Sequence, residues 1–350
     1  MKNPLSLSPL SLAVLGLFSS LSGHAVAQTS TALDTIVVSG SRSETKLSET
    51  PASIGSVSRT QWDADKPKSV GEIINRIPGV HWNDLGNEQH SMAIRQPIST
   101  NAVYQYLEDG IPIRPLGVFN HNALNEINMN GAGGVEVVKG AASSLYGSNA
   151  VGGAVNFLTQ KPSRNASGYF GFRQDNTDGF YRFDTGASNS WGDLGLRFSH
   201  YTSERDHNNW QQYSGGKKDS FTLRGDYELS ATSWLRASLV HTNLEADMTG
   251  SLFENDYRTN LSKSINTFTW RKDKTTRLNM AWEGETTHDG LTTVTVFARN
   301  NDHGQLPSYT VSSCTVNTST CKSGVKGTIN NNHVESLGVD VKHVQELNWL

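Results

Sequence analysis

The feature that most constrains the fold of this chain is an alternation of apolar and polar side chains that begins near Ser167. Between residues 219 and 229, apolar residues and Gly occupy every second position, and Ser, Thr, Arg, Asp and Glu occupy the others. The same alternation recurs in residues 277–285 and in shorter segments up to residue 341. A period of two is typical of β-strands, because successive side chains point to opposite faces of a sheet. We therefore expect residues 166–350 to form antiparallel strands.

Both a soluble β-sandwich and a transmembrane β-barrel produce this alternation. Long strands, a strongly charged polar face that suits a wet lumen, and aromatic residues near the strand ends favour the barrel. The aromatic residues in question are Tyr169, Tyr201, Trp234 and Trp270. The mean hydropathy of -0.47 argues against a helical membrane protein. The net charge of -3, without any basic run, indicates no nucleic-acid partner.

The N-terminus carries the three parts of an export signal in order. A basic residue precedes the short apolar stretch of residues 10–21, and Ala25 and Ala27 form an A-x-A cleavage motif. A buried N-terminal helix is the alternative. We expect residues 1–27 to be a signal peptide, with Gln28 as the first residue of the mature protein.

Residues 28–50 are rich in Ser and Thr and are expected to form a flexible leader. One β-prone run stands within this leader, and its backbone is suited to strand addition at the edge of a partner's sheet. The alternative is that the run is the first strand of the next domain. The run consists of Asp34, Thr35, Ile36, Val37 and Val38.

Residues 51–165 are predicted to form a compact α+β domain. Ser69 and Glu72 have the spacing of a capping box, and the apolar residues that follow indicate one face of a helix that ends at Pro78-Gly79. Short strands separated by polar turns follow this helix. The predicted strands are residues 92–95, 102–107, 134–138 and 154–158.

Together these segments resemble a TonB-dependent outer-membrane receptor. DTIVV resembles the TonB box, and VGEIINRIPGV, MAIRQ and YLEDGIPI follow the pattern of the plug domain. The longest match, GVEVVKGAASSLYGSNAVGGAVNFLT, covers residues 134–159. The sequence departs from the family at Gln96, Gly134 and Ala141, where Gly, a basic residue and Pro are usual. These departures affect the local geometry of the plug more than the resemblance to the family.

The resemblance implies an α+β plug domain followed by the antiparallel strands of a transmembrane β-barrel. Such a barrel has about 22 strands around its plug. We count eight or nine candidate strands, so we expect the barrel to be incomplete and the chain to be part of a longer receptor. Without the remaining strands, backbone groups at the sheet edges would be unpaired in hydrocarbon, so we expect no working transporter from these strands alone.

The implied function is active uptake of a scarce nutrient across the outer membrane, above all of a ferric siderophore or another iron complex. The implied partners are TonB, which supplies the energy from the periplasm, the iron chelate and the outer-membrane lipid. A haem or cobalamin receptor is the first alternative. A passive porin or an adhesin is the second, although neither needs a TonB box or a plug.

The resemblance also places functional residues in the plug. Three charges match those that face the barrel wall in the family, with ordinary solvated charge as the alternative: Arg95, Glu136 and Lys139. A cation and aromatic rings in outward-facing plug loops suit an anionic, ring-bearing chelate, although local packing is the alternative for each residue. The expected ligand contacts are His81, Trp82, Arg114, Phe119 and His121.

Cys314 and Cys321 lie in a Ser/Thr-rich segment of an exported chain and are expected to form a local disulfide in an extracellular loop. Two free thiols are the alternative, and a metal site is disfavoured because no His or further Cys flanks the pair. We find no G-x-S-x-G, H-E-x-x-H or P-loop pattern, so the chain is not expected to be an enzyme. No cofactor and no metal site are expected.

Overall fold

The computed structural model describes residues 35–99, 101–114, 120–207, 209–287, 290–319 and 321–345. The predicted signal peptide, Asp34 and Phe119 lie outside the described residues, as do the side chains of residues 120–122. The chain divides into two units, Met1–Thr35 and Ile36–Leu350, and every element below belongs to the second. In the described residues, no helix has both the length and the apolar character needed to cross a membrane.

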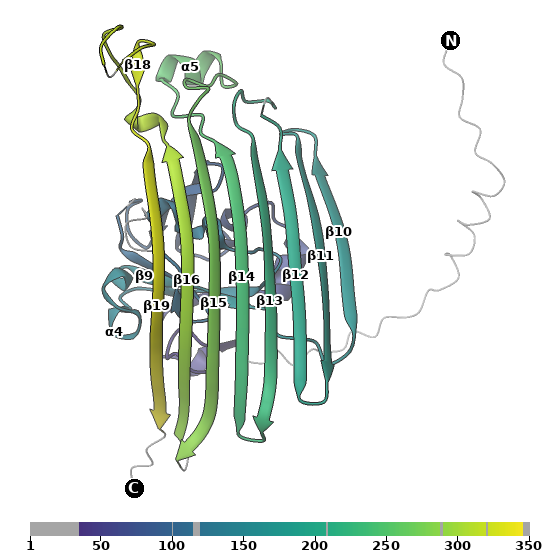
Figure 1. Cartoon of the computed structure of the whole chain (residues 1–350). Coiled ribbons are helices and arrows are strands. Elements are labelled where there is room, and N and C mark those ends of the chain that lie inside the picture. Colours follow the sequence, from purple (N-terminus) through teal and green to yellow (C-terminus); the bar gives the residue numbers. More distant parts are fainter. Residues whose placement is uncertain are drawn as a thin grey trace, which may run out of the picture. The chain divides into compact units, whose positions relative to one another are not determined.

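The unit contains two layers, a small α+β layer formed by residues 36–165, called the plug here, and a sheet of long strands (Figure 1). The plug strands are β1 (Ile36–Val37), β2 (Thr45–Lys46), β3 (Ile54–Ser58), β4 (Val80–Gly86), β5 (Gln89–Ile94), β6 (Tyr104–Glu108), β7 (Ile111–Pro112), β8 (Ala132–Lys139) and β9 (Gly153–Thr159). The plug helices are η1 (Leu47–Glu49), α2 (Arg59–Asp65), α3 (Val70–Ile74), η2 (Asn120–Glu126), α4 (Ser143–Tyr146) and η3 (Ser148–Ala150).

The centre of the plug is a five-stranded sheet in the order β3-β8-β9-β6-β7, in which only β6 and β9 run parallel. One face packs against α3, the β4–β5 hairpin and η2 through buried side chains that include Ile73, Tyr104 and Phe157. The other face packs against β1 and α4 through Val37 and Tyr146. Burial of each large apolar side chain contributes about 1.5–3 kcal/mol, so these two cores hold the plug together.

The second layer is an eight-stranded antiparallel sheet, called the large sheet, in the order β10-β11-β12-β13-β14-β15-β16-β19. Its strands are β10 (Ser167–Asp175), β11 (Phe180–Trp191), β12 (Leu194–Arg205), β13 (Gly216–Ser230), β14 (Ser233–Asp247), β15 (Trp270–Thr287), β16 (Gly290–Leu306) and β19 (Asn330–Gln345). The sheet does not close, because β10 and β19 form its two edges. This agrees with the predicted partial barrel.

The two ends of the large sheet differ. At the loop end, residues 206–215, 248–269 and 307–329 connect consecutive strands, and they contain α5 (Glu254–Thr259), η4 (Ser308–Thr310), β17 (Ser312–Ser313) and β18 (Val325–Lys326). At the opposite end, called the turn end, β11 meets β12 and β13 meets β14 through two-residue turns. Long loops on one side and short turns on the other are typical of outer-membrane barrels.

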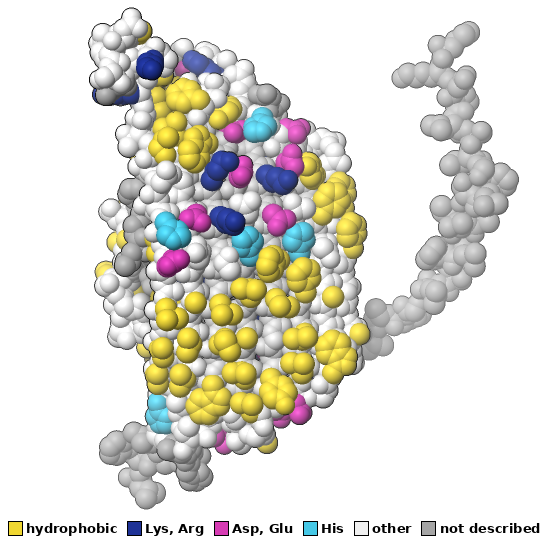
Figure 2. Space-filling view, viewed as in Figure 1, with side chains coloured by type: hydrophobic (Ala, Val, Ile, Leu, Met, Phe, Trp, Pro, Cys, Tyr) yellow, Lys and Arg dark blue, Asp and Glu magenta, His cyan; other side chains and the backbone are white. Residues whose placement is uncertain are grey.

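The polarity of the large sheet is inverted relative to a soluble protein. On β13, Thr222 and Arg224 are buried against the plug, whereas Leu223 and Tyr227 are 45% and 42% exposed on the outer face. Figure 2 shows hydrophobic side chains gathered over the turn-end half of this face, with a band of charged and His side chains nearer the loop end. An apolar exterior around a polar interior is the pattern expected of lipid-facing strands.

Three sequence-based expectations differ from the structure. The capping box belongs to α2, where Ser58 and Gln61 bond reciprocally, whereas Ser69 makes no side-chain cap to α3. Residues 36–50 of the predicted flexible leader are ordered, because β1 pairs with β2. Tyr201 is buried beneath Arg182 and does not lie on the outer face among the predicted interfacial aromatics.

Candidate functional site

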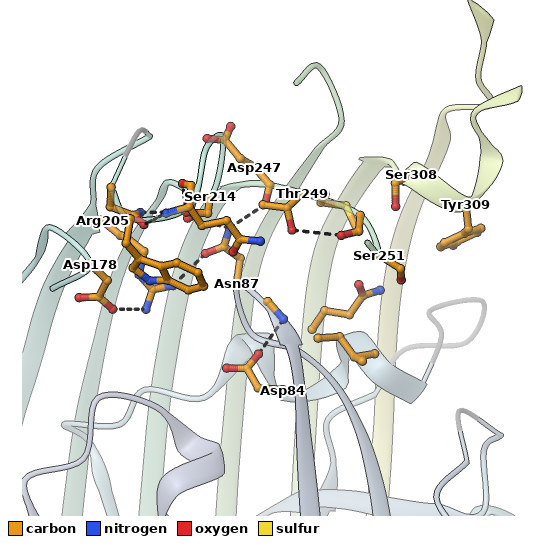
Figure 3. A pocket seen from close by; sticks show the side chains of 18 residues that line it. Asp84, Asn87, Asp178, Arg205, Ser214, Asp247, Thr249, Ser251, Ser308 and Tyr309 are labelled. Atoms are coloured by element: carbon orange, nitrogen blue, oxygen red, sulfur yellow. Dashed lines mark hydrogen bonds and ion pairs between the residues drawn. The ribbon is translucent and has the colours of Figure 1, made fainter. Parts of the chain in front are cut away.

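The plug and the large sheet enclose a cavity of about 690 Å³ at the loop end (Figure 3). The plug contributes the tip of the β4–β5 hairpin, and the sheet contributes its connecting loops. This volume is in the range of sites for small molecules. The lining residues are Asp84, Leu85, Gly86, Asn87, Gln89, Asp178, Arg205, Asn209, Trp210, Gln211, Ser214, Asp247, Met248, Thr249, Gly250, Ser251, Ser308 and Tyr309.

Asn87 fixes the hairpin tip to the loops of the sheet. Its Nδ2 donates to the carbonyl oxygen of Asp247 at 2.6 Å and to that of Gly215 at 3.1 Å. Its Oδ1 accepts from Nη1 of Arg205 at 3.2 Å. A single plug residue thus bonds to the connection between β12 and β13 and to the ends of β12 and β14. A ligand that displaces these residues would therefore also displace the plug.

The charged groups of the cavity are mostly carboxylates. Asp178 is paired with Arg205, with Nη2 and Oδ2 3.3 Å apart. Asp247 accepts from the backbone nitrogen of Gly215 at 3.1 Å and faces His207. Asp84 accepts from the backbone nitrogen of Gly86 at 2.8 Å, a local bond that shapes the hairpin turn.

Near the turn end, the segment that follows the predicted TonB box is fixed to the plug by buried polar groups. The Glu136 carboxylate accepts from the backbone nitrogens of Val38, at 3.0 Å, and Ser39, at 2.7 Å. Asn156 Nδ2 donates to Oγ of Ser39 at 2.9 Å. Because these bonds use the backbone donors that strand addition needs, the end of the box is engaged with its own plug.

Tyr146 adds a further contact to this segment. Its hydroxyl donates to the carbonyl oxygen of Ser39 at 3.0 Å. Burial raises the pKa of Tyr146 to about 12, so the hydroxyl keeps its proton at physiological pH. Arg42 then connects the same segment to the large sheet, with its Nη2 2.5 Å from Oδ1 of Asp340. Lys342 Nζ also donates to the carbonyl oxygen of Arg42 at 2.6 Å.

A buried ion network joins the plug to the middle of the large sheet. Arg277 on β15 lies 2.9 Å from Glu108 and 2.5 Å from Glu126, and Arg299 on β16 also pairs with Glu126. Burial raises the pKa of both carboxyls, and the neighbouring guanidinium groups oppose that shift. Each of the four groups therefore depends on the others to remain charged away from water.

Close approach between the layers also depends on one glycine. A Cβ on Gly131 would lie 2.5 Å from Oγ1 of Thr222. Neighbouring Asn128 donates to that same Oγ1 at 2.9 Å, and Asn130 donates to the carbonyl oxygen of His200 at 2.7 Å. Polar side chains thus form much of the plug–sheet contact.

The predicted ligand residues do not come together in the structure. Trp82 is buried and stacks on His90, with ring centroids 3.9 Å apart, whereas His81 points to the exposed side of β4. Because neighbouring strand residues face opposite ways, the pair cannot act on one ligand. Arg114 lines a separate cavity of about 200 Å³ beside β15 and β16. Phe119 and the side chain of His121 lie outside the described residues.

The predicted plug–barrel charges also lie elsewhere. Arg95 donates to Oγ of Ser53 at 2.8 Å, Lys139 Nζ donates to the carbonyl oxygen of Pro78 at 3.3 Å, and Glu136 holds the N-terminal segment. Their partners in these hydrogen bonds are thus plug residues. Glu108, Glu126 and Asn87 make the contacts with the sheet instead, and sequence reasoning missed them. Only the Gly86-Asn87 turn signal between two strands offered a hint of the hairpin.

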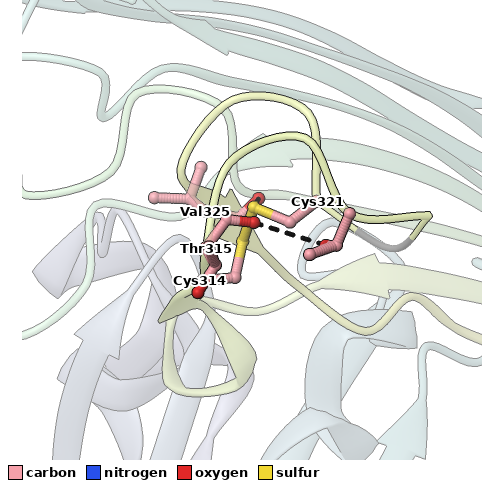
Figure 4. Close-up of a disulfide and its surroundings, with 5 residues drawn as sticks. Cys314, Thr315, Cys321 and Val325 are labelled. Carbon is pink, nitrogen blue, oxygen red and sulfur yellow. Dashed lines mark hydrogen bonds between the residues drawn. A yellow bond between two sulfur atoms is a disulfide. The ribbon is translucent and has the colours of Figure 1, made fainter.

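Cys314 and Cys321 form the expected disulfide in the connection between β16 and β19 (Figure 4). The bond closes a short loop beside β18 at the loop end. Among the described residues, no group of three or more His, Cys, Asp or Glu side chains is arranged to hold a metal ion.

Comparison with known proteins identifies the plug. Residues 46–154 match the family model of the TonB-dependent receptor plug domain. The chain therefore carries a TonB-dependent receptor plug domain. A segment of 130 residues of this chain is 33% identical to the vitamin B12 transporter BtuB of Vibrio vulnificus (strain CMCP6), covering 36% of the chain and 20% of that transporter.

Solved receptors share the fold of plug and sheet. The unliganded ferric citrate transporter FecA has a TM-score of 0.70 at 17% identity, covering 84% of this chain and 44% of its own. FpvAI in complex with pyocin S2 has a TM-score of 0.73 at 18% identity, covering 90% of this chain and 43% of its own. The chain thus spans less than half of the length of these relatives. These relatives are described as transporters and receptors, one of them from the outer membrane, which agrees with the family that the sequence resembles.

Proposed function

We propose that this receptor takes up a metal chelate across the outer membrane with energy supplied by TonB. One arrangement carries the proposal: the plug closes a ligand-sized cavity at the loop end and holds the box-like segment near the turn end. With the long loops outside the cell, the cavity faces the medium and the segment faces the periplasm. One domain is thereby in contact with both the nutrient and the energy source.

In this proposal, residues 34–38 are the TonB box. Ile36 is 52% exposed and offers a side chain to a partner, whereas Val37 is buried in the plug. TonB would pair with the backbone of this segment by strand addition once the bonds to Glu136 open. Force on the box is then transmitted to β8, the strand that carries Glu136 in the plug sheet.

A ferric siderophore is the first candidate for the cargo, because solved receptors of the same fold include a ferric citrate transporter and receptors for ferripyoverdine. Cobalamin is the second candidate, favoured by the 33% identity to a vitamin B12 transporter. Growth of a receptor-deficient strain on single iron or corrinoid sources, with the receptor supplied in trans, distinguishes the two.

The experiment that tests energy coupling is Ile36→Pro in a receptor with the complete barrel, with Ile36→Ala as the matched control. Proline removes a backbone donor and fixes φ, so strand addition should be lost. We expect chelate binding at the loop end to persist and uptake to stop, whereas Ile36→Ala should retain both. Uptake that continues in Ile36→Pro would show that this segment is not the TonB box.

A further inference from the structure

We propose that the loop-end cavity selects a chelate without net negative charge, that is, a neutral or cationic complex. The inference deepens the proposed function and rests on it. The charge of the cavity carries the argument. Its described lining contains three carboxylates, from Asp84, Asp178 and Asp247, and one cation, from Arg205, so that 1 − 3 gives a net charge of −2.

The carboxylates are not equivalent. Asp178 is compensated, because Arg205 and Lys68 lie within ion-pairing distance of it. Asp84 has only the backbone nitrogen of Gly86 as its hydrogen-bond donor among the described contacts, and Asp247 has a backbone nitrogen and His207. Among the described residues, neither Asp84 nor Asp247 thus has a Lys or Arg at ion-pairing distance, and the buried Arg271 interacts with Asp84 only through space.

The charged groups just behind the cavity lining do not change the sign of its net charge. Lys68 pairs with Asp175, and Lys218 pairs with Glu88 at 2.5 Å. Arg271 is fully buried beneath the hairpin, where its Nη1 donates to the carbonyl oxygen of Asn87 at 3.2 Å, and Asp273 is buried on the same face of β15. These groups add three positive and three negative charges and leave the cavity acidic.

The remaining lining suits a ligand rich in hydrogen-bonding groups. Amide side chains come from Asn87, Gln89, Asn209 and Gln211, and hydroxyls come from all three connecting loops. Two aromatic residues, Trp210 and Tyr309, are 53% and 61% exposed there. Aromatic faces beside carboxylates attract cations and repel anions. Hydroxamate or amide-rich complexes fit this chemistry, whereas an anionic tris-catecholate would bring three further negative charges.

The test compares three ferric complexes of different charge on the purified receptor in detergent micelles. The probes are a cationic linear trihydroxamate, a neutral cyclic trihydroxamate and an anionic tris-catecholate, with binding measured by calorimetry. We expect the cationic and neutral complexes to bind at least about tenfold more tightly than the anionic one. Tighter binding of the anionic complex would overturn the inference on charge, whereas binding of none of the three, nor of cyanocobalamin, would count against the proposed function itself.

Substitutions of Asp84 test whether this carboxylate contributes to the charge preference of the cavity. In Asp84→Asn, the amide oxygen still accepts from Gly86, so the turn is retained while one charge is removed. We expect the preference for the cationic over the anionic complex to fall severalfold, and to fall further in Asp84→Lys. Asp193→Asn, in the turn between β11 and β12, is the matched control and should leave the preference unchanged. An unchanged preference in both Asp84 variants, each folded by circular dichroism, would overturn the inference.

Discussion

Nη2 of Arg42 lies 2.5 Å from Oδ1 of Asp340, which is 298 residues further along the chain. The pair joins the segment just after the proposed TonB box to β19 of the large sheet. Its side chains are 22% and 31% exposed, so water reaches it and screens it in part. The N-terminal segment is therefore held by two layers, by Glu136 in the plug and by Asp340 in the sheet.

Charge reversal tests this contact. Arg42→Glu should speed hydrogen exchange of the peptide covering residues 36–46 a fewfold, because a partly exposed ion pair contributes about 0.2–1 kcal/mol. The double variant Arg42→Glu with Asp340→Arg should restore protection. Arg258→Glu breaks an exposed pair with Glu254 in α5 and is the control. Protection that does not recover in the double variant would indicate that the pair itself does not hold the segment.

Removing the charge of Glu136 should have a larger effect. A hydrogen bond to a charged group contributes about 1.5–3 kcal/mol, so Glu136→Gln should speed exchange of the Val38 and Ser39 amides by about tenfold or more. Glu72→Gln is the matched control, because Glu72 accepts from the backbone nitrogen of Lys68 at 3.0 Å in another part of the plug. Mass spectrometry with fragmentation localises the change, and equal effects of both variants would contradict this prediction.

The central ion network should be intolerant of losing one member. Arg277→Ala leaves Glu108 and Glu126 buried with one guanidinium between them, and we expect a loss of about 3–5 kcal/mol in the free energy of unfolding. Arg236→Ala on β14 is the control, because its pair with Glu283 is 4.0 Å long with side chains 34% and 27% exposed, and should contribute less than about 1 kcal/mol. Denaturant unfolding followed by tryptophan fluorescence measures both, and equal stabilities would refute the assignment.

The disulfide should protect its loop and little else. Reduction should speed tryptic cleavage at Lys322 and Lys326, which flank Cys321 on its C-terminal side, while the eight-stranded sheet keeps its circular dichroism spectrum. The closed loop is short, so the stabilisation is at the low end of about 2–4 kcal/mol. Mass spectrometry without reductant should find both thiols oxidised, and free thiols would contradict the assignment.

The sequence predicts the large sheet well, because a period of two assigns each residue to a face. Thr222 and Leu223 could be placed on opposite faces from the pattern alone, and the structure confirms them. The same rule could have separated His81 from Trp82, since both lie on one strand. The predicted strands of the plug were also found, although β5, β6, β8 and β9 each extend beyond a predicted bound and β5 ends before Arg95.

The functional contacts could not be predicted, because they depend on tertiary pairing. Glu136 was identified as a plug charge, but nothing local indicates that its partners are backbone groups 97 and 98 residues earlier. Ser69 and Ser58 both satisfy the capping pattern in sequence, and only the folded chain shows which side chain turns back. The acidic cavity combines a hairpin tip with loops that are far away in sequence.

The polar contacts of Asn128 and Asn130 with the large sheet affect how the plug can move. Two apolar surfaces resist separation, because water cannot replace the contacts that they lose. Amide and hydroxyl groups can exchange each other for water almost bond for bond, so the net free energy of parting them is small. A plug seated on such a surface can shift in hydrated steps under a modest pull, without melting either of its own apolar cores.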